Sequence, residues 1–239
     1  MRRTVREVAF LGWLSLLTFA CVLAPPRVAA AAELATLNLA QDASCWGPVL
    51  FHYVPSLTTI INEPIPNELE TVIRVAKLRL SSRSDDTLLV DYDAGPSCDP
   101  GFIIYRIERG GPRLLAYAII GLELEAPGDG CFYVRGHADS WFDKRRTFTV
   151  DGGDLRELRQ PFYYVGLETK TLKQIIVFSS EGFSEETRVV PAGTPITVLL
   201  NDGDSFLLKT DHDVLGWWRP RSTSPQKAEE IEGLFLRGD

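Results

Sequence analysis

Short apolar runs separated by glycine-, proline- and aspartate-rich turns repeat along most of the chain. Two such runs cover residues 102–107 and 114–120, and the segment between them holds Gly110 and Gly111, which allow the positive φ angles of a hairpin turn. Similar runs recur about every 8–15 residues. The pattern predicts an all-β fold that is mainly antiparallel.

One segment, residues 67–80, also fits a helix. Its apolar positions are Leu69, Val72, Ile73, Val75, Ala76 and Leu80. Their intervals of three and four residues favour one short helix that begins at about 66–68. The β-branched side chains and the alternation of residues 75, 77 and 79 fit a strand as well, so both interpretations stay open.

The first 32 residues predict a secretory signal peptide. Residues 1–6 are basic, residues 8–24 are almost wholly apolar, and residues 29–32 are all alanine. We therefore expect cleavage near residues 30–32 and export to the periplasm or the extracellular space. Two alternatives are a retained transmembrane anchor, which Pro25 and Pro26 would interrupt, and lipidation at Cys21 in a lipoprotein box.

Charge argues against nucleic acid as a partner. The whole chain has a formal net charge of −7. Residues 1–32 contain four of the 25 basic and one of the 32 acidic side chains, so the mature part has a formal charge of about −10. Such a surface repels phosphate backbones. No later segment is long and apolar enough to predict a membrane span.

Three cysteines, Cys45, Cys98 and Cys131, remain after removal of the leader. Export implies an oxidising compartment, in which cysteines tend to pair. We expect a Cys98–Cys131 disulfide because both residues lie in Gly/Pro-rich turns; Cys45–Cys98 is the competing bridge. The spacing of cysteines and histidines matches no zinc or haem motif, so we expect no metal and no cofactor.

The last fifth of the chain carries short motifs of a known module. Residues 193–198 read Gly-Thr-Pro-Ile-Thr-Val, a polar turn follows at 201–204, Phe206 begins an aromatic strand, and Gly216-Trp217 closes the pattern. Residues 171–219 thus resemble a bacterial SH3-like domain. The resemblance implies a small closed barrel that recognises a cell-wall peptide or a protein partner.

This resemblance divides the chain into four parts. We expect a signal peptide at 1–32, a β-rich domain at 33–168, an SH3-like barrel at 169–220 and a polar tail at 221–239. Neighbouring residues of a strand point to opposite faces, so one of Trp217 and Trp218 should pack inside the barrel. By the resemblance Trp217 is the packed residue, and Trp218 points outward to a ligand or to the preceding domain.

The candidate binding residues are mainly aromatic. Residues 135–146 form the most polar-aromatic segment, in which Trp141 and Phe142 could stack on a ligand while Arg145 and its basic neighbours meet an anion. The other interpretation is a connecting loop whose Trp141 caps the core. We add Trp218 and Phe206 to this set of candidates.

No catalytic motif stands out. The sequence has no Gly-x-Ser-x-Gly, and the one nucleophile to consider is Cys45, with His52 or His137 as its partner. We therefore expect an exported, non-enzymatic binding or accessory protein of the bacterial cell envelope. The alternatives are a wall-active hydrolase or peptidase that uses Cys45, and a structural or assembly factor for another envelope protein.

Overall fold

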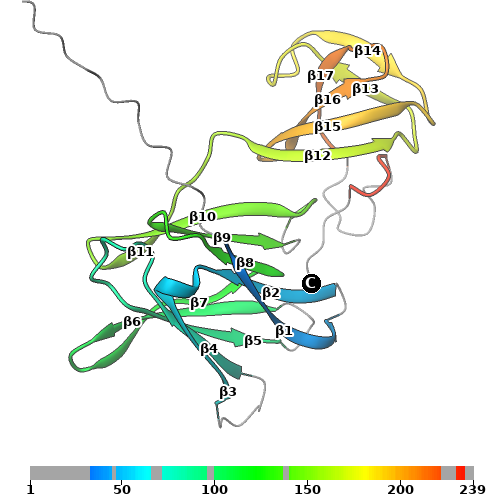
Figure 1. Ribbon diagram of the computed structural model, residues 1–239. Coiled ribbons are helices and arrows are strands. Elements are labelled where there is room, and N and C mark those ends of the chain that lie inside the picture. The colour runs from blue at the N-terminus through cyan, green and yellow to red at the C-terminus, as the bar shows by residue number, and fades with distance from the viewer. Residues whose placement is uncertain are drawn as a thin grey trace, which may run out of the picture. The chain divides into compact units, whose positions relative to one another are not determined.

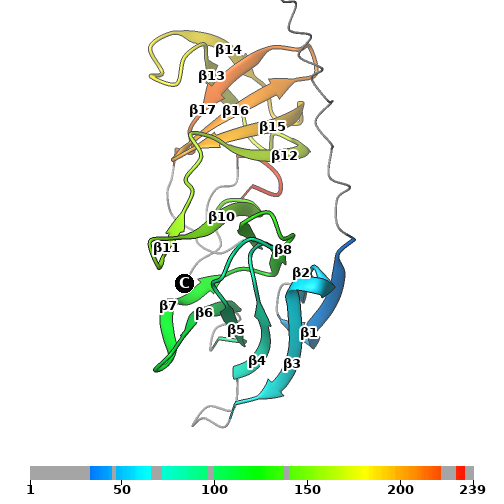
Figure 2. The same ribbon diagram turned by 60° about the vertical axis from the view of Figure 1, so that its left-hand side comes forward.

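Strands make up nearly all of the regular structure (Figures 1 and 2). The computed structural model describes residues 33–44, 47–65, 72–95, 100–136, 140–221 and 230–234. In these ranges the chain forms seventeen strands and one short 3₁₀ helix, η1 (Pro55–Leu57), with no α-helix. The prediction of an all-β, mainly antiparallel fold is confirmed.

The strands before residue 160 form two sheets that share one core. The first sheet has the order β1 (Ala35–Ser44), β2 (Gly47–Tyr53), β8 (Glu123–Ala126), β9 (Cys131–Gly136), β10 (Lys144–Asp151), β11 (Asp154–Glu157). The second has the order β3 (Thr58–Pro64), β4 (Val72–Leu78), β5 (Leu88–Asp93), β6 (Gly101–Glu108), β7 (Gly111–Ile120). Pairing is antiparallel except between β2 and β8. Phe51 and Phe132 of one sheet and Phe102 of the other lie fully buried in the common core.

The third sheet carries the C-terminal part of the chain and has its own core. Its order is β12 (Tyr163–Lys170), β15 (Pro195–Asp202), β16 (Ser205–Thr210), β17 (Leu215–Trp218), β13 (Ile175–Phe178), β14 (Glu186–Val190), all antiparallel. Strand β16 shows why the sheet has two distinct faces. Its Phe206 and Leu208 are buried, whereas Leu207 and Lys209 between and after them point away from the core.

The helix considered for residues 67–80 is wrong for the described part of that segment. Residues 72–78 form strand β4, which pairs with β3 and β5 in the middle of the second sheet. Val72, Ile73 and Val75 are β-branched and fit a pleated surface better than a helix. Val75 and Ala76 are fully buried, so sheet packing on both sides overrides the helical spacing.

The expected barrel is an open sheet in the described residues. Strands β12 and β14 stand at the two ends of the strand order, and no ladder joins them in this part of the chain. Strand β17 pairs with β13 through Phe178 and Trp217. The sheet begins at Tyr163, six residues before the expected domain boundary.

The described residues include no helix with the length and apolar character needed to span a bilayer.

Candidate functional site

Four of the five predicted binding residues meet in the core of the third sheet. The Phe206 ring lies at the centre, with centroid distances of 5.9 Å to Trp218, 6.3 Å to Trp141 and 6.4 Å to Phe142. Phe206, Trp218 and Phe142 are 0%, 3% and 6% exposed. Trp141 is half-buried and packs against the same core, as expected for a residue that caps it. These rings stabilise the sheet.

The orientation expected for the two adjacent tryptophans is wrong. Trp218 lies across from Phe206 on the core face, and Trp217 lies across from Leu207 on the outer face. Gly216 shares the core face with Trp218, and a Cβ at this position would lie 2.6 Å from Cβ of Val177. Strand β13 therefore leaves no room for a side chain at Gly216, which favours the register that turns Trp218 inward.

Arg145 does not join this cluster. Its Nη2 lies 2.7 Å from Oε2 of Glu125, and its guanidinium stands 4.7 Å from the ring centroid of Tyr133. The Tyr133 hydroxyl donates a 2.6 Å hydrogen bond to Asp129, which raises the pKa of Tyr133 to about 12. Arg145 thus belongs to a polar network on the first sheet.

A groove of about 380 Å³ opens beside Trp218, where β17 ends. We call it the Trp218 groove, and its principal lining residues are Ile176, Phe178, Phe183, Trp218, Arg219 and Arg221. Ile176 and Phe178 come from β13, Phe183 from the loop between β13 and β14, and the arginines from the segment after β17. The groove thus combines an apolar wall with two guanidinium groups.

Arg219 is held at this groove by two contacts. Its guanidinium stands 4.7 Å from the ring centroid of Phe183, and its Nη2 donates a 3.2 Å hydrogen bond to Oγ of Ser205, which is buried. A guanidinium has five N–H donors in a planar fork. Among the described residues, no ion pair joins Arg219 to a carboxylate, and the bond to Ser205 uses one of its five donors.

Phe183 supports Arg219 from a strained backbone position. Its φ is +54°, a left-handed conformation that bulky residues rarely adopt. The ring makes an edge-on contact with Phe178, with centroids 5.2 Å apart, and its backbone N–H donates to the carbonyl of Ser180. Backbone strain of this kind persists only where surrounding contacts maintain it. It is concentrated at functional sites.

Arg221 is fixed by a carboxylate, unlike Arg219. Its Nε lies 3.6 Å from Oε1 of Glu230, and its backbone N–H donates to Oε2 of the same residue. Glu230 is only 8% exposed, and its carbonyl accepts a hydrogen bond from the backbone N–H of Leu172. The pair ties the described C-terminal segment 230–234 to the third sheet.

A pair of carboxyl groups completes the surroundings of Arg219. A hydrogen bond between Glu181 and Asp202 raises the pKa of Glu181, and the positive charge of Arg219 opposes this shift. The arginine therefore stands between an apolar wall and an acidic rim, which Glu181 and Asp202 form.

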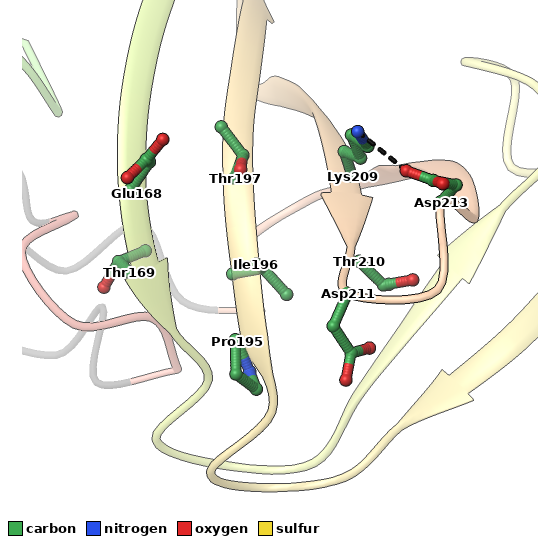
Figure 3. A pocket seen from close by; sticks show the side chains of 9 residues that line it. All are labelled: Glu168, Thr169, Pro195, Ile196, Thr197, Lys209, Thr210, Asp211 and Asp213. Atoms are coloured by element: carbon green, nitrogen blue, oxygen red, sulfur yellow. Dashed lines mark ion pairs between the residues drawn. The ribbon is translucent and has the colours of Figure 1, made fainter.

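A second, more polar depression of about 290 Å³ lies on the same sheet (Figure 3). Glu168 of β12, Thr197 of β15 and Lys209 of β16 lie side by side there, and they are direct register partners. Nζ of Lys209 lies 2.7 Å from Oδ1 of Asp213, an ion pair that lowers the pKa of Asp213. No cluster of three potential metal ligands occurs among the described residues.

Comparison with protein-family models, curated proteins and solved structures finds no match to this chain. The function must therefore be argued from the site alone.

The predicted disulfide is not formed in the described part of the chain. Cys131 has a free thiol whose pKa is raised by burial and by the nearby Asp129 carboxylate. Because Cys131 is free, the expected Cys98–Cys131 bridge is not formed. Cys45 and Cys98 both lie outside the described residues, so the competing Cys45–Cys98 bridge stays a prediction.

The residues needed for the alternative catalytic site are largely outside the described ranges. Cys45 and His137 lie outside them. His52 is described, and its Nδ1 is 2.8 Å from Oγ1 of Thr36. The sequence interpretation missed Arg219, Phe183 and Arg221. The one signal for the two arginines was the Arg-Pro-Arg sequence of residues 219–221, directly after the two tryptophans.

Proposed function

We propose that this chain is an exported, non-enzymatic accessory protein of the bacterial cell envelope that binds a peptide in the Trp218 groove. The peptide belongs either to the cell wall or to a protein partner. The basic, apolar and alanine-rich segments of residues 1–32 support export. The groove supports binding of a ligand that has both an apolar part and a carboxylate.

The observation that carries the proposal is the position of Arg219. Its guanidinium lies against Phe183 at a groove wall, anchored to Ser205 and without a carboxylate partner among the described residues. A fork of N–H donors in this setting matches a carboxylate bidentately. Stem peptides of the cell wall and the C-termini of proteins both provide carboxylates.

The apolar wall supplies the second half of recognition. Ile176, Phe178 and Phe183 are all half-buried, so each still has surface to cover. An apolar ligand side chain gains about 25 cal/mol per Å² of apolar surface that it removes from water. The acidic rim at Glu181 disfavours a second carboxylate close by, which would fix the direction in which a peptide lies.

The proposal is tested with soluble wall peptides, released from purified peptidoglycan by an amidase that separates peptide from glycan. Isothermal titration should detect binding to the mature protein. Arg219→Ala removes the charge-assisted hydrogen bonds, which contribute about 1.5–3 kcal/mol. The dissociation constant should therefore rise about 10- to 100-fold.

Arg156→Ala is the matched control, because Arg156 is an exposed arginine of β11 that pairs with Asp151. The Arg156→Ala variant should bind the peptides with the same affinity as the unaltered protein. Absence of binding to wall peptides removes the cell-wall form of the proposal. The protein-partner form is then tested with C-terminal peptides carrying a free carboxylate or an amide, and equal affinity for the two removes it as well.

A further inference from the structure

A continuous row of apolar side chains crosses the outer face of the third sheet. The register aligns Tyr164 of β12, Leu200 of β15, Leu207 of β16, Trp217 of β17 and Phe178 of β13. Directly opposed residues in antiparallel strands point to the same face. We call these five residues the outer-face row. With strands spaced about 4.8 Å apart, the row is roughly 19 Å long.

The outer-face row is accessible to solvent. This is unusual because each of its members is apolar or aromatic. Tyr164 is 73% exposed, and the four others are half-buried. Phe162, itself 41% exposed, adds a ring whose centroid lies 6.3 Å from that of Trp217. The core of the sheet lies on its opposite face, so packing inside the protein does not require these rings. An exposed strip of this composition marks an interaction surface.

The exposed ring of Tyr164 lies against the backbone of its own strand. A Cβ at Gly166 would lie 2.5–2.6 Å from the outer ring atoms and the hydroxyl oxygen of Tyr164. The ring therefore lies against the backbone of Gly166, which has a φ of +65°. Only glycine allows this close approach, and one face of the ring is left open to solvent.

Polar side chains follow the row along one side. Glu168, Thr197 and Lys209 form the next row on the same face and border the polar depression (Figure 3). They supply hydrogen-bond donors and acceptors together. The ion pair of Lys209 with Asp213 neutralises the one cation among them. This combination suits neutral hydroxyl groups better than an anionic ligand.

We propose that the outer-face row binds a neutral polysaccharide chain, with pyranose rings stacked on Tyr164 and Trp217 and hydroxyl groups directed to Glu168, Thr197 and Lys209. The proposal goes beyond peptide binding in the Trp218 groove, because it assigns another class of ligand and a surface that shares only Phe178 with the groove. The apolar C–H faces of pyranose rings pack on aromatic rings, while their hydroxyl edges need polar partners.

The dimensions of the row favour this ligand over other polymers. The row is one side chain wide, whereas a stable protein interface buries about 800 Å² on each partner. An extended peptide laid across the strands would find their N–H and C=O groups already paired in the ladders, so its own backbone groups would have no partners on this face. The acidic chain, with a net charge of −7, also repels anionic lipids and nucleic acids.

The test uses two soluble neutral probes, chitohexaose and cellohexaose, titrated into the full-length mature protein by isothermal calorimetry. We expect at least one of them to bind with a dissociation constant in the millimolar range or tighter. Trp217→Ala and Tyr164→Ala should each weaken binding at least tenfold. Gly166→Ala should weaken it too, because it displaces the Tyr164 ring without removing it.

Tyr117→Ala is the matched control, since Tyr117 of β7 is 70% exposed on another sheet. This variant and Arg219→Ala should bind the sugars as the unaltered protein does, which separates this proposal from peptide binding in the groove. Near-ultraviolet circular dichroism confirms that each variant is folded.

Three results would overturn the proposal. The first is no heat of binding with either hexasaccharide at millimolar concentration. The second is equal sugar affinity in folded Trp217→Ala. The third is binding to phosphatidylcholine vesicles that Trp217→Ala abolishes, which would assign the row to a membrane surface.

Discussion

Trp218 lies directly across the β16–β17 pair from Phe206, with their ring centroids 5.9 Å apart in the core of the third sheet. Its neighbour Trp217 lies on the opposite face, where it is half-buried. The two adjacent tryptophans thus lie in different environments, one in the core and one on the outer face of the sheet. Trp218 stabilises the sheet, and Trp217 is available to a ligand.

This difference predicts unequal effects on stability. Trp218→Ala should lower the free energy of unfolding by about 3–5 kcal/mol, because it leaves a cavity between Phe206 and the rest of the core. Trp217→Ala should lower it by only about 1 kcal/mol, because less apolar surface returns to water. Urea denaturation followed by far-ultraviolet circular dichroism measures both. Equal losses would show that the assignment of faces is wrong.

The ion pair between Arg74 and Asp91 gives a second prediction. Asp91 is 1% exposed and accepts bonds of 3.1 and 3.3 Å from Nε and Nη2 of Arg74. Arg74→Leu leaves this carboxylate buried without its guanidinium and should cost about 2–4 kcal/mol of stability. Because Arg74 is partly exposed, the lower part of this range is expected.

Adding Asp91→Leu to Arg74→Leu should restore most of the lost stability, since no charge is then left unpaired. Urea denaturation of the two single variants and the double variant measures the interaction directly. Strictly additive losses would contradict a coupled pair.

The hydrogen bond from Tyr133 to Asp129 predicts a dependence on alkaline pH. It raises the pKa of Tyr133 to about 12, above the value of about 10 in an unfolded chain. The folded state therefore holds this proton more tightly, and its contribution to stability is complete below pH 10 and is lost as the pH rises through 12. The hydrogen bond is exposed to solvent, which screens it, so the effect on stability is small.

Absorbance at 295 nm measures the titration of the tyrosines. One phenol should ionise near pH 12, and Asp129→Asn should move its pKa towards 10. Glu125→Gln, which alters the same surface through Arg145, serves as a control and should leave a late-titrating phenol. An unchanged titration in Asp129→Asn would contradict the assignment.

The class of fold was predictable, because it depends on local periodicity. Period-two alternation and Gly/Asp turns mark strands such as β15 and β16 without knowledge of their partners. The segment that became β4 was ambiguous, because β-branched residues at helical spacing satisfy both patterns. Burial within the sheet stabilises the strand. Burial depends on residues that are distant in the sequence, so the local pattern could not reveal it.

The binding surfaces were less predictable, because they depend on register. A shift of one residue exchanges the two faces of a strand, and the close approach of Gly216 to Val177, which favours the register of β17, joins residues far apart in sequence. The contact of Trp141 with Phe206 is of the same kind. In the sequence, Arg219 is an ordinary charged residue after a strand end. Its proposed role in binding depends on its contacts with Phe183 and Ser205, which lie elsewhere in the sequence.

Peptide binding in the Trp218 groove is tested most directly by a ¹H–¹⁵N correlation spectrum recorded during titration with amidase-released wall peptides. Single Trp→Phe variants assign the indole signals of Trp217 and Trp218. The account predicts that the peptides shift the indole signal of Trp218 and the Nε–H signal of Arg219 and leave that of Trp217 in place. Shifts confined to Trp217, or no shift at saturating peptide, would contradict it.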